Sequence, residues 1–338
     1  MATPEISVLM SVRNGAGFLP STLQSLANQR FDPIEFIIVD DGSEDATPGI
    51  LADWAQRDGR VRIITQSPQA SNGLAHALNV GFDHCRAPLI ARADVDDLYH
   101  SDRLALQYAR MQAVPDLAAL SCGFRRIDAH GNSLGDRPPL TGSEKIAFTT
   151  LFQSSLLHPG AMIRADALRD VGGYDTTYWT AQDSDLWARL IAAGARLDNL
   201  PDLLVDYRIH DTSLVRKRGP EGRALSLGVP ARMQAAYLGG LPPEHDVAAV
   251  VALYQGVEPL NLRRLRRALA GAERILRAAR GREREDVLEH ARTQFLKGLR
   301  QQQVRAARTA LPKRLLLRHA LTRWQDADFS WESNNALL

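Results

Sequence analysis

The sequence lacks several features that mark specialised classes of protein. Its 338 residues include only two cysteines, Cys85 and Cys122, which are too few for a disulfide framework and suit a reducing compartment. No window offers about 20 uninterrupted apolar residues, so we expect no membrane-spanning helix. The N-terminus has no basic segment followed by an apolar run, so we expect no signal peptide. These absences favour a cytoplasmic protein.

Charge is distributed unevenly along the chain. The formal net charge is only +2, but residues 256–324 hold 18 Lys and Arg against 6 Asp and Glu. The rest of the chain holds 23 basic and 33 acidic residues, so its balance has the opposite sign. A basic region on an acidic body usually has a membrane or a nucleic acid as its partner.

The first 125 residues alternate short β-rich runs with helical patterns. Strands are predicted at residues 6–12, 35–40, 61–65 and 88–93. Helices are predicted between them at residues 19–28, 47–57 and 73–85. This alternation indicates βαβ units and an α/β fold with a mostly parallel sheet flanked by helices. Ligands of such sheets bind beyond the carboxyl ends of the strands.

The later part of the chain changes from a mixed to a helical pattern. Further strands are predicted at residues 157–164 and 203–209, and a helix at residues 183–193. Beyond Leu214, apolar residues recur at helical spacing to about Trp324, with arginines on the other face. We therefore predict an α/β domain at residues 1–215 and a basic, mainly helical C-terminal region at residues 216–338.

Polar residues follow three of the predicted strands. They are Arg13-Asn14-Gly15 after the first, Asp40-Asp41 after the second and Asp94-Val95-Asp96-Asp97 after the fourth. Because the carboxyl ends of parallel strands meet at one edge, we expect these groups to converge on one rim of the sheet. A dinucleotide-binding domain would carry Gly-x-Gly-x-x-Gly after its first strand, and residues 13–17 lack the third glycine. We therefore expect no nicotinamide cofactor.

The carboxylates after the fourth strand form a candidate metal site. Alternation along an extended chain places Asp94 and Asp96 on one side and turns Asp97 away. Crowded carboxylates repel one another unless a cation neutralises them, and hard oxygen ligands favour Mg²⁺ or Mn²⁺. The alternative is an acidic turn that only caps the helix after it.

The adjacent carboxylates Asp40 and Asp41 also allow two interpretations. A carboxylate here could accept hydrogen bonds from a pyrimidine N–H or from ribose hydroxyls. Asp and Ser beside a glycine also commonly form a strand-to-helix turn, which would cap the helix predicted at residues 47–57. Two adjacent carboxylates are more than capping needs, which favours a role in ligand binding.

These segments together resemble the family 2 nucleotide-diphosphosugar glycosyltransferases, which have the GT-A fold, from about residue 6 to residue 210. The motifs are, in order, ISVLMSVRNG at 6–15, EFIIVDDGSEDAT at 35–47, NGL at 72–74 with ALN at 77–79, and IARADVDD at 90–97. Each motif is weak alone, but their ordered coincidence is specific. The resemblance implies a GT-A catalytic domain at residues 1–215, followed by the helical extension.

The resemblance also implies which residues bind the donor and the metal. Residues implied to contact the nucleoside are Arg13, Asn14, Asp40, Asp41, Asn72 and Gly73. Asp94 would contact the ribose or the sugar, and Asp96 would bind the Mn²⁺ or Mg²⁺ ion that bridges the two phosphates. His210 occupies a position where many relatives have a further metal ligand, although a lone histidine at a strand end is more often a surface residue.

The proton acceptor implied by the resemblance is Asp183, in the segment AQDSDLW at 181–187. An acceptor hydroxyl is a poor nucleophile until a base takes its proton during attack on the anomeric carbon. Gln182 stands where the family usually has Glu, which puts the acceptor contacts in doubt. Asp183 and Asp185 could instead only cap the helix. His158 could line the acceptor side or belong to a plain turn.

The function implied is inverting, metal-dependent transfer of a sugar from a nucleotide-diphosphate donor, with a UDP-sugar favoured. The acceptor would be a hydroxyl of a glycan or a lipid-linked molecule in polysaccharide or lipopolysaccharide synthesis. The alternative is a catalytically degenerate protein of the same fold that binds a nucleotide-sugar or glycan without turnover.

The basic C-terminal helices allow three interpretations. They could be an ordinary solvated surface, or they could contact an anionic membrane from the cytoplasm, as basic amphipathic helices do. Nucleic-acid binding is the weakest interpretation, because aromatic residues that could stack on bases are scarce among these arginines.

Overall fold

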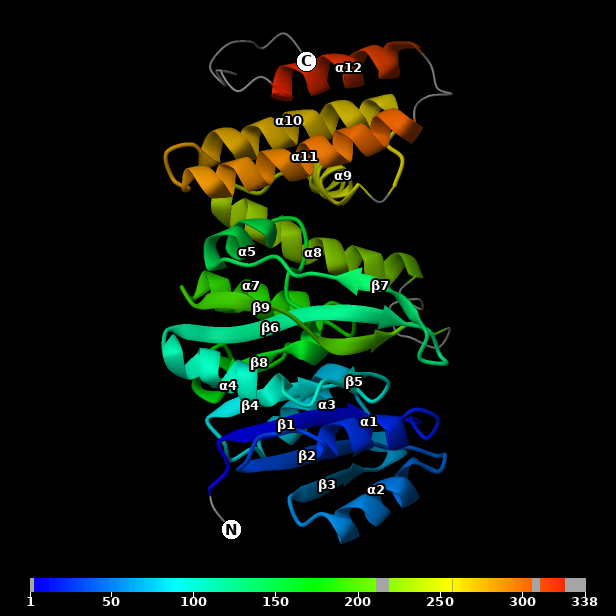
Figure 1. Cartoon of the computed structure of the whole chain (residues 1–338). Helices are drawn as coiled ribbons and strands as arrows, with labels where there is room; N and C mark the ends of the chain where they lie inside the picture. Colours follow the sequence, from blue (N-terminus) through cyan, green and yellow to red (C-terminus); the bar gives the residue numbers. More distant parts are fainter. Residues whose placement is uncertain (1–2, 211–218, 257, 306–310, 326–338) are drawn as a thin grey trace. The chain divides into compact units, whose positions relative to one another are not determined.

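The computed structural model describes residues 3–210, 219–256, 258–305 and 311–325 (Figure 1). The chain divides into two compact units. One, the sheet unit, comprises Met1–Ile146 and Ser154–Arg223, and the other, the helical unit, comprises Ala147–Gln153 and Ala224–Leu338. The predicted boundary between residues 215 and 216 lies outside the described residues, so that division stays a prediction.

The sheet unit contains one sheet, in which nine strands are described. They are β1 Ile6–Val12, β2 Ile34–Asp41, β3 Val61–Gln66, β4 Leu89–Ala93, β5 Leu98–Tyr99, β6 Leu117–Ile127, β7 Ser133–Arg137, β8 Met162–Arg164 and β9 Arg196–Arg208. Their order is β3-β2-β1-β4-β8-β6-β9-β5, with β7 paired to β6. The α/β fold predicted from the sequence is confirmed.

Strands β3, β2, β1 and β4 are mutually parallel, as the alternation of strands and helices predicts. Val12 lies opposite Asp40 and Met10 opposite Ala93, so β1, β2 and β4 end at the same edge. This register brings the segments that follow the three strands to one rim. The rim is where the sequence places its candidate site.

The other half of the sheet makes it mixed. β8 pairs antiparallel with both β4 and β6, while β6 and β9 run parallel. The two-residue strand β5 pairs antiparallel with the end of β9, with Leu98 opposite Asp206. This pairing brings the acidic turn after β4 beside the end of β9. The sequence analysis did not predict β5, β6 or β7, and the strand predicted at residues 157–164 is wrong before Met162, where a 3₁₀ turn at His158–Gly160 takes its place.

Helices cover both faces of the sheet, which explains why β1, β2 and β4 are almost entirely buried. Those of the described residues up to 210 are α1 Leu19–Ala27, α2 Thr47–Arg57, α3 Leu74–Phe82, α4 Arg103–Ala113, α5 Ser143–Thr149, α6 Ala165–Asp170 and α7 Gln182–Ala192. Alternating residues of β1 pack on opposite faces: Val8 and Met10 pack with leucines of α1, and Leu9 packs with Leu78 of α3.

The helical unit contains five described helices, as the sequence pattern predicts. They are α8 Gly219–Leu238, α9 Glu244–Gln255, α10 Leu262–Ala279, α11 Glu285–Arg305 and α12 Leu311–Gln325. Its core includes Phe152, whose ring stacks on Tyr254 at 4.1 Å between centroids, and Phe295 of α11. Across the described residues, no helix is both long enough and apolar enough to cross a membrane.

Candidate active site

The loop after β1 is fixed to the loop after β2 by reciprocal hydrogen bonds. The Asn14 amide N–H donates to Ser43 Oγ at 2.9 Å, and Asn14 Oδ1 accepts from the Glu44 amide at 2.8 Å. Asn14 takes a left-handed conformation with φ of 53°, which Asn tolerates better than most residues. The Gly15 amide donates to Thr47 Oγ1 at 2.9 Å. The two loops therefore form one rigid edge of the rim.

Asp40 and Asp41 end β2 and play different local roles. Asp40 Oδ1 accepts from the Ser43 amide at 3.0 Å, so Asp40 does form the turn that the sequence left open. Asp41 Oδ2 accepts from Ser71 Oγ at 2.8 Å, and Ser71 Oγ accepts from Arg13 Nη1 at 2.9 Å. Burial raises the pKa of the Asp41 carboxyl, although the Ser71 hydrogen bond opposes this.

The second oxygen of Asp41, Oδ1, is buried and has no hydrogen-bond partner within the described structure. Leaving a buried acceptor unpaired costs about 1–3 kcal/mol. A ligand N–H or O–H placed there would recover that cost. The exposed residues Asn72 and Gly73 follow Ser71 directly, with Gly73 at a φ of 86° before α3. The structure thus brings together Arg13, Asp41 and the 72–73 segment.

Asp94, the first residue after β4, is held by a buried arginine that the sequence analysis did not single out. Arg92 Nη2 donates to Asp94 Oδ1, and Arg92 Nη1 donates to the carbonyls of Leu9 and Ala93, each at 2.7 Å. Arg92 is fully buried, whereas the Asp94 side chain keeps 29% exposure. Burial raises the pKa of Asp94, and the Arg92 charge opposes this. An arginine inside an otherwise apolar strand is the signal that could have found it.

Asp96 contacts His210. The family resemblance implies that these two residues are ligands of one metal ion, which requires them to be neighbours. Asp96 Oδ2 and His210 Nε2 lie 2.7 Å apart, with 25% and 12% of their side chains exposed. Arg208 Nε donates to the Asp96 carbonyl at 2.7 Å and fixes the turn. The His210 ring lies 4.8 Å from the ring of Phe18, centroid to centroid.

The chemistry of this pair suits a divalent cation. One carboxylate oxygen and one imidazole nitrogen lie close enough to share an ion, and such sites usually take their other ligands from substrate phosphates and water. Among the residues that the structure describes, no group of three or more His, Cys, Asp and Glu is arranged to hold a metal by itself. Asp96 and His210 therefore fit Mn²⁺ or Mg²⁺ that binds together with a diphosphate.

Asp97 is buried and bonded to the chain beside β9, but the reason given from the sequence for its placement does not apply. β4 ends at Ala93, and residues 94–97 form a turn, so strand alternation does not apply there. Asp97 is buried and its Oδ1 accepts from the Arg208 amide at 2.8 Å. Burial raises the pKa of Asp97 well above its usual value, with Asp96 and Asp94 adding to the effect. Asp97 fastens the turn to β9.

Asp183 lies in the first turn of α7, after Ala181 at a left-handed φ of 63°. Its charge contributes to raising the pKa of Asp94, so the two carboxylates lie close enough to interact. Asp183 is half-buried, whereas Asp185 is fully buried and accepts from Arg189 Nε at 2.7 Å. Asp185 is thus a structural ion-pair residue, whereas Asp183 is the carboxylate of this helix whose charge acts on Asp94.

His158 does not line an open acceptor surface, because it is buried. Its Nε2 lies 2.9 Å from the Tyr174 hydroxyl and 3.3 Å from Arg92 Nε. Burial, with the Arg92 charge adding to it, lowers the pKa of His158 well below its usual value, so the ring is a neutral acceptor. Its ring also packs against Trp187 of α7. His158 therefore connects Arg92, which holds Asp94, with the helix that carries Asp183.

Comparison with known proteins identifies the family. The model of the family described as "Glycosyl transferase family 2" matches residues 7–172. The O-antigen biosynthesis glycosyltransferase WbnJ of Escherichia coli is 30% identical over 211 residues, which cover 62% of this chain and 81% of WbnJ. The UDP-Gal:alpha-D-GlcNAc-diphosphoundecaprenol beta-1,3-galactosyltransferase of Escherichia coli is 28% identical over 219 residues, covering 64% and 78% of the two chains.

Among solved structures, the fold is similar to that of the mannosyltransferase PcManGT of Pyrobaculum calidifontis. The TM-score is 0.58 at 21% identity, and the match covers 96% of this chain and 87% of PcManGT. That similarity concerns the fold alone, and the sequence relatives carry the family assignment. With its rim of Asp41, Asp94, Asp96 and Asp183 on a GT-A-type sheet, this chain belongs to glycosyl transferase family 2.

Proposed function

We propose that this chain is a metal-dependent, inverting glycosyltransferase that moves a sugar from a nucleotide-diphosphate donor to a hydroxyl of a glycan or lipid-linked acceptor. The observation that carries the proposal is the meeting of Asp94, the Asp96–His210 pair and the charge of Asp183 at one rim. These are the groups needed for donor binding, metal binding and proton acceptance. Membership of the family and an O-antigen enzyme among the relatives support a role in polysaccharide assembly.

A UDP-sugar is the donor that we propose. The unpartnered Asp41 Oδ1 is an acceptor for the imide N–H of a uracil ring or for a ribose hydroxyl, and Arg13 and Ser71 hold the carboxylate in place. One relative is named for UDP-Gal as its donor, which supports the same nucleotide here. PcManGT, by contrast, was solved with GDP-Man, so the nucleotide must be tested directly.

The metal would be held by Asp96 and His210. When bound, a divalent cation supplies positive charge that stabilises the departing diphosphate. PcManGT was solved with Mn²⁺, which supports Mn²⁺ as the ion. Arg208 positions the Asp96 backbone, and Arg92 holds Asp94, which would contact the ribose or the sugar.

Asp183 would act as the base. The acceptor oxygen forms a bond to the anomeric carbon while the bond from that carbon to the diphosphate oxygen breaks. The electron pair of the broken bond leaves with the nucleoside diphosphate, and Asp183 takes the hydroxyl proton. One displacement of this kind inverts the anomeric configuration.

The test is a screen of UDP-sugars and GDP-sugars for released nucleoside diphosphate, with Mn²⁺ and with excess chelator. We expect release from a UDP-sugar that depends on the metal. Asp41→Ala should raise the donor KM far more than it lowers kcat, because in this proposal Asp41 would contact the nucleoside and not the reacting atoms. Release that prefers GDP-sugars, or an unchanged KM in Asp41→Ala, would overturn the nucleotide assignment.

A further inference from the structure

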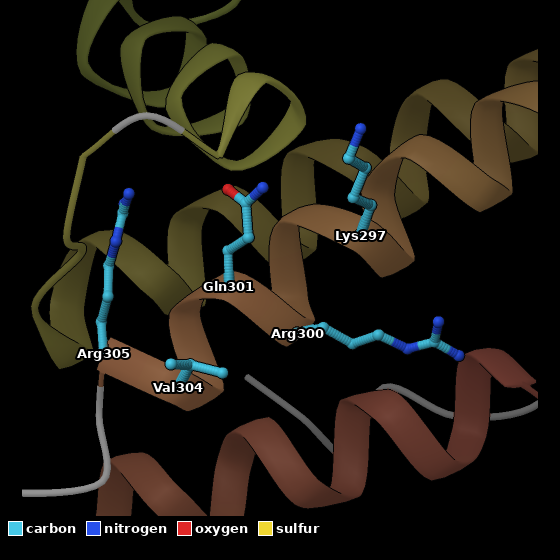
Figure 2. A pocket seen from close by; sticks show the side chains of 5 residues that line it. All are labelled: Lys297, Arg300, Gln301, Val304 and Arg305. Atoms are coloured by element: carbon cyan, nitrogen blue, oxygen red, sulfur yellow. The ribbon is translucent and has the colours of Figure 1, made fainter.

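The exposed side of α11 carries a group of basic side chains that the proposed reaction does not use. Lys297, Arg300, Gln301, Val304 and Arg305 line a hollow of about 320 Å³ on this helix (Figure 2). Their spacing of three and four residues places them on one helix face. Val304 is 78% exposed, so an aliphatic surface lies among the cations. We call these five residues the α11 face.

The opposite side of α11 is anchored, so this face cannot turn inward. Phe295, Leu299 and Gln302 are buried in the helical unit. A Cβ added at Gly298 would lie 1.8 Å from the Leu253 carbonyl oxygen, so α11 approaches α9 as closely as a glycine permits. The rotation of α11 is therefore fixed by packing, and the α11 face stays on the surface of its unit.

The cations of this face differ from those of the neighbouring helix α10. On α10, Arg264 pairs with Glu258, and Arg267 and Arg274 lie 3.9 Å and 4.0 Å from the carboxylate of Asp246. For Lys297, Arg300 and Arg305, by contrast, no ion pair is found in the described part of the chain. These three arginines of α10 lie beside carboxylates of the same unit, whereas the cations of the α11 face are available to a partner.

The stretch of sequence that contains the α11 face has no acidic residues. Residues 290–325, which include the second half of α11 and all of α12, contain nine Lys and Arg and no Asp or Glu. Leu315 of α12 is a second aliphatic side chain with high exposure, at 56%. Such a combination of basic and exposed aliphatic side chains is complementary to an anionic lipid bilayer, which has charged headgroups at its surface and apolar acyl chains beneath them.

We propose that the α11 face docks on an anionic membrane surface, with Lys297, Arg300 and Arg305 at the phosphate headgroups and Val304 at the boundary of the acyl chains. Figure 2 shows the charged ends spread apart along the helix rather than converging on one point, which suits an array of headgroups better than a single bound phosphate. No aromatic side chain is among the five, so the α11 face itself offers no ring on which a nucleic-acid base could stack. This docking goes beyond the proposed reaction and does not depend on turnover.

The test is co-sedimentation of the full chain with vesicles made of equal parts phosphatidylglycerol and phosphatidylcholine. Lys297→Gln with Arg300→Gln should weaken binding about thirtyfold, since each basic residue near an anionic surface contributes about 1 kcal/mol. The matched control is Arg57→Gln with Arg62→Gln, which removes the same charge from exposed positions of α2 and β3 and should leave binding nearly unchanged. High salt should weaken wild-type binding.

Val304→Ser separates docking by the α11 face from general attraction of a positive protein. It leaves the charge unchanged and should still weaken binding measurably, because an exposed aliphatic contact is lost. Equal loss in the two double variants, or equal binding to vesicles of phosphatidylcholine alone, would overturn the proposal. So would tight binding of single-stranded RNA by a chain that does not bind vesicles.

Discussion

Arg92 at the rim of the sheet unit is buried and paired, whereas the charged side chains of the α11 face are exposed and form no ion pair among the described residues. Arg92 has no exposed surface and is bonded to Asp94, two carbonyls and His158. Lys297 and Arg300 lie fully on the surface of the helical unit. Buried charges must have partners because desolvation is costly, and the partners fix their geometry. Exposed charges fix little within the fold but can attract a distant partner.

The difference teaches that the two units should respond differently to the same kind of substitution. Removing a charge at the rim should damage folding or chemistry by a large factor. Removing a charge from the α11 face should leave both nearly intact and change only binding to an external surface.

The largest effect is expected for Asp183→Asn. The amide keeps the shape of the side chain but cannot accept the proton, so transfer should fall about 10²–10⁴-fold while donor binding survives. The measurement is the transfer rate with the true acceptor, together with donor affinity by calorimetry. Asp185→Asn is the control: it removes a buried ion pair with Arg189, so it should lower stability more than the transfer rate of folded enzyme. A near-normal transfer rate in Asp183→Asn would mean that Asp183 is not the base.

Arg92→Met should destabilise the sheet unit by about 3–5 kcal/mol, because Asp94 would remain without its buried partner. The measurement is the free energy of unfolding from urea denaturation. Arg30→Met is a suitable control, since its ion pair joins an exposed arginine to the partly exposed Asp102 and should cost no more than about 1 kcal/mol. A similar loss of unfolding free energy in both variants would mean that Arg92 contributes no more to stability than a surface arginine.

Asp96→Ala should lower the transfer rate by about a hundredfold or more, since a metal that stabilises the leaving group supplies several kcal/mol. Donor binding measured with and without Mn²⁺ should lose its metal dependence in this variant. His210→Ala should weaken the apparent Mn²⁺ affinity in the same assay. If Asp96→Ala kept a metal-dependent donor affinity, the ion would have to bind elsewhere.

His158 should give the sheet unit a pH-dependent stability. Its pKa in the folded chain is far below the unfolded value of 6.5, so the unfolded chain binds more protons between these two values. Stability should therefore fall as the pH drops below about 6.5, with a slope of up to about 1.4 kcal/mol per pH unit from this group. His158→Gln, which keeps an acceptor toward Tyr174 and Arg92, should remove that component. An identical pH profile in the variant would contradict the assignment.

The smallest effect on the fold is expected for Lys297→Gln with Arg300→Gln. Exposed substitutions away from special features usually change stability by no more than about 0.5 kcal/mol. The free energy of unfolding and the release of nucleoside diphosphate from the donor should both stay close to wild type. A large loss in either would mean that the α11 face has a structural or catalytic role, and the contrast between the units would fail.

The sequence was sufficient to predict those parts of the site that follow from the order of the parallel strands. Parallel strands at 6–12, 35–40 and 88–93 imply a shared edge, and the structure brings the residues after them together. The elements it did not predict are those set by long-range pairing. β5 has only two residues and exists because β9 lies beside it, and β9 thereby brings His210 to Asp96.

The sequence pattern also did not predict which polar side chains are buried. Arg92, Arg103 and His158 are polar residues that a sequence would place on the surface, yet all three are buried. Each has hydrogen-bond partners in other elements: Arg103 Nη2 donates to the carbonyl of Arg92 at 2.7 Å, and His158 Nε2 lies 2.9 Å from the Tyr174 hydroxyl. Arg103 Nη1 has no hydrogen-bond partner within the described residues. Only the folded chain shows that such partners exist.

The central claim is that the rim of the sheet performs one inverting displacement from a metal-bound donor. The most direct test is NMR of the product formed by the wild-type chain from an α-linked nucleotide-sugar, with Mn²⁺ and in excess chelator. The account predicts a β-linked product that forms only when the metal is present. An α-linked product, or an undiminished rate in chelator, would contradict it.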